Sequence, residues 1–132
     1  VCAHMGLTPQ SVNRLGGFRV QGRDPQQANT IIQEALMLEE YGASMLLLEC
    51  IPSSLGLAIS EKLSIPVIGI GAGKDVDGQI MVMHDVLGIS PVTPKFVKNF
   101  LAKSKEGIPG AIKSYVNAVK DGSFPSPEQS YK

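Results

Sequence analysis

The run Ser44-Met-Leu-Leu-Leu-Glu49-Cys-Ile-Pro52 joins a short apolar segment to a carboxylate and a proline. Its apolar part, Met45–Leu48, predicts a strand that is buried on both faces, as strands of parallel sheets are. Glu49 follows directly, and parallel α/β folds bind their ligands at the carboxyl ends of the strands. Glu49 is therefore a candidate functional side chain. The alternative is a structural carboxylate that pairs with a neighbouring lysine or arginine.

The segments around this run alternate between helix and strand. Asp24-Pro25 is typical of a helix start, with an N-cap residue before a proline, and Gly42 is typical of a helix end. A second helix is predicted from about residue 53 to 63, and Val67–Ile70 predicts another buried strand. Short connections of this kind indicate right-handed βαβ units, which make the strands parallel.

The two ends of the chain extend this pattern. Residues 1–5 predict a first strand, and residues 80–83 a fourth strand that ends at His84. The remainder predicts helices over 94–103 and 111–120, broken at 107–110, and an extended tail over 123–132. We expect one domain over 1–132. Val1 is not a methionine, and it already belongs to the predicted first strand. We therefore expect the sequence to be a piece of a longer polypeptide.

The composition excludes several classes of protein. Twelve basic and 12 acidic residues give a net charge of zero, so no charged field attracts nucleic acid. No apolar run approaches the roughly 20 residues of a membrane span, and no secretory signal is visible. Two cysteines are too few for a disulfide framework. We therefore expect a cytoplasmic protein with reduced thiols.

The glycine-rich segment Gly69–Asp75 suggests a nucleotide-binding loop but fails both pattern tests. Lys74 stands where the dinucleotide fingerprint needs glycine or alanine, and Asp75 stands where a P-loop needs serine or threonine. The glycines instead allow a ligand or a packed neighbour to approach the backbone closely.

The histidines and Cys50 allow two interpretations each. His4 and His84 end predicted strands, where each is either a buried structural histidine or a donor to a substrate oxygen. Their spacing from the carboxylates does not match a metal site, so we predict no metal ligand set in this chain. Cys50 is a possible nucleophile, but strand alternation points it away from Glu49.

The segment Thr8–Asp24 is long for a connection inside a compact domain, and such loops are usually functional. It leaves the carboxyl end of a strand and carries Arg14, Arg19 and Arg23. A lid over bound substrates and a subunit contact are both possible roles. The alternative is a mobile surface excursion.

Several motifs occur in a fixed order along the chain: Val1-Cys-Ala-His4-Met-Gly-Leu-Thr-Pro-Gln10-Ser, Gly17-Phe-Arg-Val-Gln-Gly22-Arg, Leu47-Leu-Glu49-Cys-Ile-Pro52, Ile65-Pro-Val-Ile-Gly-Ile-Gly-Ala-Gly73, Asp77-Gly-Gln-Ile-Met-Val-Met-His84-Asp85 and Pro94-Lys-Phe. Together with the gaps between them, they resemble ketopantoate hydroxymethyltransferase, specifically its carboxyl-terminal half. The resemblance covers essentially the whole chain.

This resemblance implies a (β/α)8 TIM barrel, of which the chain supplies about the last four β/α units. It implies hydroxymethyl transfer from methylene-tetrahydrofolate to α-ketoisovalerate (3-methyl-2-oxobutanoate), the first step of pantothenate biosynthesis, in a large homo-oligomer. Glu49 matches the general base, and burial would raise its pKa. His4 matches a substrate-pocket histidine. The Mg2+ ligands are expected before Val1, and the folate-contacting residues stay unassigned.

The sequence also allows two other hypotheses about the function. An open, doubly wound α/β module that binds a ligand without chemistry suits four strands well. A lyase of the phosphoenolpyruvate mutase kind shares magnesium and α-keto acid chemistry. The residues before Val1 and a folate-dependent product would distinguish these readings.

Overall fold

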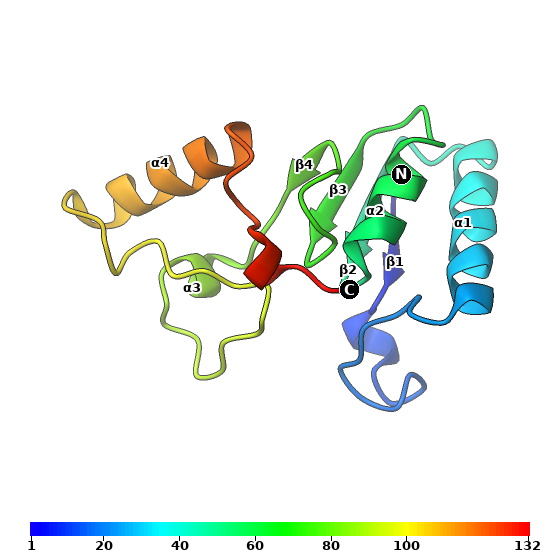
Figure 1. Ribbon diagram of the computed structural model, residues 1–132, viewed down its shortest axis with the longest axis horizontal. Helices are drawn as coiled ribbons and strands as arrows, with labels where there is room; N and C mark the ends of the chain where they lie inside the picture. The colour runs from blue at the N-terminus through cyan, green and yellow to red at the C-terminus, as the bar shows by residue number, and fades with distance from the viewer.

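The computed structural model describes all residues from 1 to 132. One parallel sheet of four strands forms its centre, in the order β1-β2-β3-β4 (Figure 1). The strands are β1 Cys2–Gly6, β2 Met45–Glu49, β3 Val67–Ile70 and β4 Gly78–Gln79. The predicted parallel βαβ arrangement is confirmed, because each strand pairs with the next along the chain.

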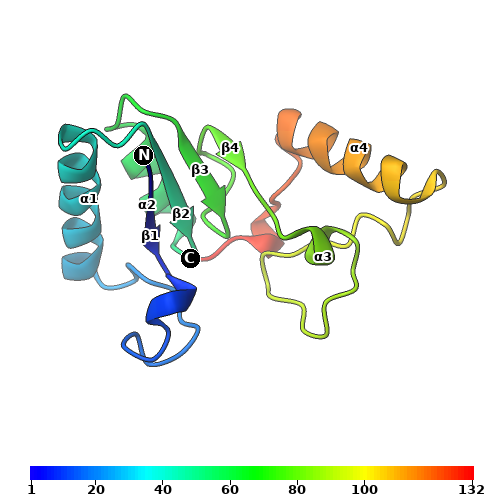
Figure 2. The same cartoon turned by 180° about the vertical axis from the view of Figure 1, so that it is seen from behind.

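Two long connections of this sheet contain helices, α1 Pro25–Glu40 and α2 Ser53–Ser60. The start of α1 is as predicted, since the Asp24 side chain accepts a hydrogen bond from the Gln27 backbone N–H. Both helices lie on the same face of the sheet, which is seen from its other side in Figure 2. Right-handed crossovers between neighbouring strands always place the helices on one face in this way.

The main core lies between that face and the two helices. Leu46, Leu48 and Val67 are fully enclosed there against Ile31 of α1 and Ile59 of α2. The alternate residues of the strands point to the opposite face, which no helix covers. Of these, Leu47 is only half-buried. Within this chain, β2 is therefore buried on one face and not on both.

A second, smaller core lies away from the sheet. It contains the short helix α3, Met83–Val86, and the helix α4, Gly107–Lys120. The rings of Phe100, Tyr115 and Phe124 meet edge to face, with centroids 5.5–5.9 Å apart. The Tyr115 hydroxyl donates to the Gln79 carbonyl over 3.1 Å and thereby joins α4 to β4. No helix in the chain is both long and apolar enough to cross a membrane.

The prediction was wrong about several elements in this second part. The fourth strand is Gly78–Gln79 and not 80–83, because pairing with Ile68 and Gly69 sets its position. Val82, predicted inside it, is 52% exposed. Residues 94–103 form turns without a helix, held partly by the Asn99 side chain, which accepts from two backbone N–H groups.

Two boundaries also differ from the prediction. Helix α4 includes residues 107–110, where a break was predicted, because a proline in the first helical turn loses no hydrogen bond. The tail over 123–132 is extended at its ends but contains a single 3-10 turn, Pro127–Gln129.

Candidate active site

The two residues at the centre of the site come from neighbouring strands. The β1–β2 register places Gly6 opposite Glu49, so that His4 and Glu49 lie on the same face of the sheet. The His4 Nε2 atom lies 3.0 Å from Glu49 Oε2, which is hydrogen-bond distance. The Leu7 backbone N–H donates to the Glu49 carbonyl over 2.8 Å and fixes the end of β2. The structure thus brings together the two residues that the sequence singled out.

Glu49 lies in an environment that favours a proton on its carboxyl group. Its side chain is 15% exposed, and burial raises its pKa above the ordinary 4.5. His4 opposes this shift through its charge and its hydrogen bond. Within this chain the partner of Glu49 is His4, and no lysine or arginine forms an ion pair with it. The direction of the predicted pKa shift is confirmed.

Cys50 does not behave as strand alternation predicted. It lies just beyond β2 with φ +49, a left-handed conformation that is uncommon for residues other than glycine. As a result, Cys50 and Glu49 line the same cavity. Burial raises the pKa of the Cys50 thiol to about 11. The thiol is therefore protonated at neutral pH and is a poor nucleophile.

A cavity of about 600 Å³ opens beside Glu49 at the carboxyl end of β2. Its apolar lining comes from the segments that follow β1 and β4: Leu7, Phe18, Val20, Val92, Pro94 and Phe96. Its polar groups are contributed by Arg19, Glu49, Cys50 and Tyr131. The cavity therefore combines a mostly apolar wall with a single carboxylate.

The segment Thr8–Asp24 forms part of this cavity. Its Gln21 backbone N–H donates to the Cys50 carbonyl over 3.0 Å, and the buried Gln21 side chain donates to the Arg19 carbonyl over 2.8 Å. These contacts attach the segment to the end of β2. These hydrogen bonds do not fit the alternative of a mobile surface loop.

The C-terminal tail closes one side of the cavity, which the sequence did not predict. Residues 52 and 131 form an isolated parallel bridge, and the Tyr131 carbonyl accepts from the Ser53 backbone N–H over 3.0 Å. The Lys95 ammonium donates to the Ser130 carbonyl over 2.6 Å. No local pattern marks Tyr131, because its neighbours in the tail are mostly polar and have no period.

The glycine turn after β3 serves packing. A side chain at Gly71 would overlap with the Phe96 ring, and one at Gly73 would overlap with Ser53. The close approach predicted for these glycines is therefore an approach of protein neighbours.

His84 lies outside this site. It is exposed on α3 and not at a strand end, which corrects the prediction for it. The adjacent Asp85 is buried and accepts a hydrogen bond from the Ser90 hydroxyl over 2.5 Å.

Comparison with known proteins decides the family. The sequence profile described as ketopantoate hydroxymethyltransferase matches residues 1–127. The chain belongs to this family. It is similar to the 3-methyl-2-oxobutanoate hydroxymethyltransferases of Shewanella amazonensis, with 60% identity over 132 residues, and Saccharophagus degradans, with 57% over 131 residues. Each alignment covers 99% of this chain but only 50% and 48% of the relative, respectively. The chain spans about half the length of the curated relatives it matches.

The Mg2+ ion implied by the family resemblance does not fit the residues of this chain alone. No three side chains among histidine, cysteine, aspartate and glutamate lie together as a metal would require. Magnesium prefers an octahedral shell of oxygen ligands, and Glu49 is the only carboxylate at the cavity. Glu49 is also already paired with His4. The residues at this cavity therefore do not by themselves provide the oxygen ligands that a magnesium ion needs.

Proposed function

We propose that the full-length protein containing this chain transfers a hydroxymethyl group from methylene-tetrahydrofolate to 3-methyl-2-oxobutanoate, forming ketopantoate for pantothenate biosynthesis. Membership of the family supports this proposal. The observation that carries it is the buried Glu49 carboxylate, held by His4 at the carboxyl end of β2 beside an apolar cavity. A buried carboxylate at such a position suits the removal of a proton from the carbon next to a keto group.

We further propose that the chain is the carboxyl-terminal half of a (β/α)8 barrel. Its strands follow one another without a reversal of order, and both sheet-covering helices lie on one face. A doubly wound sheet instead reverses its strand order and carries helices on both faces. The uncovered face, which bears His4 and Glu49, would then line the interior of the barrel. The edges of β1 and β4 would pair with strands from the other half.

In this proposal Glu49 is the general base. Its carboxylate removes the proton from the carbon next to the keto group, and the electron pair left behind forms an enolate. A raised pKa makes Glu49 a stronger base while it is ionised. His4 orients the carboxylate through Nε2, and its Nδ1 forms no hydrogen bond within this chain. In the protonated imidazolium form, Nδ1 would donate to a substrate oxygen.

The proposed transfer consumes one molecule of water. Water breaks the two C–N bonds of the carrier's methylene group, leaving a formaldehyde unit and placing a proton on each nitrogen. The enolate carbon then forms a C–C bond with this unit. The new hydroxyl oxygen takes up the proton that Glu49 removed, which returns Glu49 to its ionised form.

We also propose that residues of the other half of the full-length protein hold the Mg2+ ion. A bound divalent cation would stabilise negative charge on the keto acid as a Lewis acid. Within this chain, Glu49 and His4 supply proton removal and orientation.

The Glu49→Gln substitution in the full-length enzyme tests the base. Glutamine keeps the size of the side chain and a hydrogen-bond acceptor for His4, but it cannot take the proton. We expect a loss of about 10²–10⁴-fold in kcat. The exchange of the keto acid's proton with solvent, measured by NMR without folate, should fall equally.

A matched control is Glu61→Gln, because Glu61 is exposed at the end of α2. This variant should exchange the proton like the parent enzyme. If Glu49→Gln also exchanges at the parent rate, Glu49 is a structural residue and the proposed mechanism is wrong.

Finally, we propose that the full-length protein forms a homo-oligomer. In support, α4 carries an exposed apolar stripe of Ile108, Ile112 and Val116, spaced four residues apart. Large exposed apolar patches commonly mark protein interfaces. Light scattering should show a smaller assembly for Ile112→Glu than for Lys113→Glu, which changes a neighbouring polar position. Equal masses for the two variants would contradict a role for this stripe.

A further inference from the structure

The cavity beside Glu49 has an aromatic character that a small branched keto acid does not require. Phe18, Phe96 and Tyr131 all line it, and the rings of Phe96 and Tyr131 meet edge to face with centroids 6.5 Å apart. Phe18 is 77% exposed, so that one aromatic face has no partner within the chain. Flat ring systems stack favourably on such side chains.

The size of the cavity also indicates a ligand that is large enough to contain a ring system. Its volume of about 600 Å³ lies within the range of about 300–1,000 Å³ that holds drug-sized ligands. The keto acid would fill only a small part of it. The other substrate of the proposed reaction is much larger, and its one-carbon unit must come into contact with the enolate formed beside Glu49. A cavity that has Glu49 in its wall meets this requirement.

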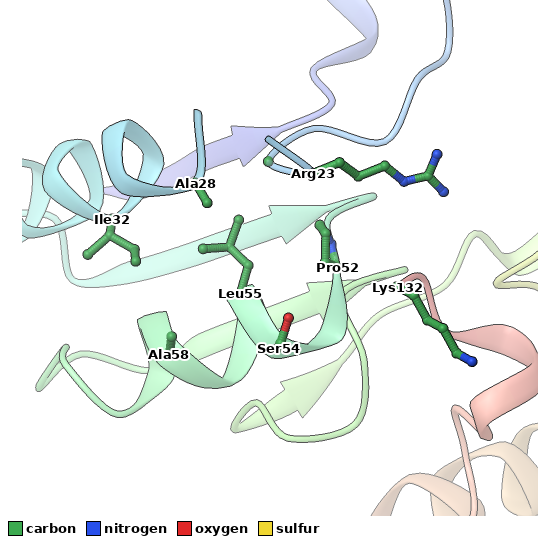
Figure 3. Close-up of a pocket in the computed structure, with 9 residues that line it drawn as sticks. Arg23, Ala28, Ile32, Pro52, Ser54, Leu55, Ala58 and Lys132 are labelled. Carbon is green, nitrogen blue, oxygen red and sulfur yellow. The ribbon is translucent and has the colours of Figure 1, made fainter. Parts of the chain in front are cut away.

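Two unpaired cations lie next to this cavity. Arg23 and Lys132 line a neighbouring groove of about 590 Å³ between α1 and α2, whose apolar floor includes Ile32 and Leu55. Figure 3 shows both cationic side chains at the end of the groove farthest from Ile32, extending in the same direction. Neither forms an ion pair within this chain. A ligand with carboxylates would find complementary charge there.

The C-terminal tail connects the cavity and the groove. Tyr131 lines the aromatic cavity, and the next residue, Lys132, lines the groove. Two anchors hold this segment: the bridge between Pro52 and Tyr131, and the Lys95 ammonium bound to the Ser130 carbonyl. We call residues 130–132 the tail strap. A ligand that lies across the strap would contact aromatic rings on one side and cations on the other.

We infer that the aromatic cavity binds the reduced-pterin ring system of the one-carbon carrier, whose pyrimidine half is flat, and that Arg23 and Lys132 bind the carboxylates of its tail. This inference rests on the proposed function, which supplies the identity of the carrier. It adds the place of binding and the separate roles of the strap, since Tyr131 contacts the ring and Lys132 contacts the tail. Neither residue moves a proton in the reaction.

The test measures the affinity of the full-length enzyme for two probes by calorimetry. Tetrahydrofolate has the ring and the carboxylate tail, whereas tetrahydropterin has the ring alone. Phe18→Ala and Tyr131→Ala should each weaken both probes about tenfold, which is the size of a lost stacking contact. Tyr131→Phe keeps the ring and should restore most of the affinity. The combined change Arg23→Ala and Lys132→Ala should weaken tetrahydrofolate alone, with a smaller effect at high salt.

The controls separate this inference from the proposed function. Tyr41→Ala removes an exposed tyrosine at the end of α1 and should leave both affinities unchanged. Keto acid proton exchange, which needs no carrier, is measured on every variant, and losses of carrier affinity should exceed changes in exchange by about tenfold. Since Phe18 is exposed, Phe18→Ala should fold even if Tyr131→Ala does not.

Three results would overturn the inference. The first is parent-like affinity for tetrahydrofolate in Phe18→Ala. The second is an equal loss of proton exchange and carrier binding, which would show that the aromatic residues act on proton removal and not on the carrier alone. The third is an equal effect of the arginine and lysine changes on both probes. A failure of the proposed base would be seen separately, as normal exchange in Glu49→Gln.

Discussion

The sheet region, residues 1–79, and the C-terminal region, residues 80–126, are stabilised in different ways. In the sheet region, 12 buried residues pack between one face of a parallel sheet and two helices. In the C-terminal region, 6 buried residues pack together, and two of them, Phe100 and Phe124, belong to a cluster of aromatic rings. The first arrangement repeats a simple βαβ unit. The second depends on contacts between Phe100, Tyr115 and Phe124, which are far apart in the sequence.

The two regions also contribute differently to the candidate site. The sheet region carries His4 and Glu49, and the C-terminal region forms part of the cavity wall. Glu49 and His4 lie on strands whose positions are set by the main core. The segment that carries Val92, Pro94 and Phe96 to the cavity lies in the C-terminal region and has no regular secondary structure. We therefore expect Glu49, the proposed base, to be held rigidly and the outer wall of the cavity to be the more easily displaced part.

The largest effect is expected for Leu48→Ala in the full-length enzyme. Leu48 is completely buried at the centre of the main core, one residue before Glu49. A large-to-small change at such a position costs about 2–5 kcal/mol. Thermal unfolding should show a Tm lowered by several degrees. A Tm equal to that of the parent would contradict the central role of this core.

A smaller and more local effect is expected for Phe100→Leu. The substitution keeps an apolar side chain but removes the edge contacts with Tyr115 and Phe124, which are worth about 0.5–1.5 kcal/mol each. Hydrogen exchange should become faster in α4 while β2 and β3 stay protected. Equal acceleration in both regions would show that they open as one unit.

His4→Phe should change the pH dependence of catalysis more than the stability. Because the proposed base acts only when ionised, we expect the rate to rise with pH through the pKa of Glu49. His4 lowers that pKa through its charge and hydrogen bond, so its removal should move the acidic limb of the kcat/KM profile to higher pH. Profiles of the parent and the variant measure this directly. A shift to lower pH would contradict the assigned electrostatics.

The smallest effect is expected for Asp121→Asn, after the end of α4. Hydrogen bonds from Ser123 lower the pKa of the exposed Asp121 carboxyl below 3.8. A lowered pKa contributes stability that is present at neutral pH and is lost as the pH falls through the folded-state value. The variant should therefore have a slightly lower Tm at pH 7, and the difference should narrow as the pH falls below 3.8. A difference independent of pH would indicate another cause.

The two regions also differ in how well their sequences predicted them. For the sheet region, β1, α1, β2, α2 and β3 were predicted at nearly their observed positions. For the C-terminal region, a strand over 80–83 and a helix over 94–103 were wrong. The predicted helix over 111–120 lies within α4, whereas residues 94–103 pack through turns that depend on contacts with distant residues.

Local signals in the sequence were sufficient for the first βαβ units and for His4 and Glu49. A cap, a proline or an alternation of apolar residues acts over a few positions, and a carboxylate after a buried strand can be recognised there. Contacts between distant residues determined the rest. The pairing of β4 with Ile68 and Gly69, the left-handed backbone of Cys50 and the place of Tyr131 all depend on partners elsewhere in the chain. Since such contacts form and stabilise the protein only in the folded chain, no local pattern in the sequence predicts them.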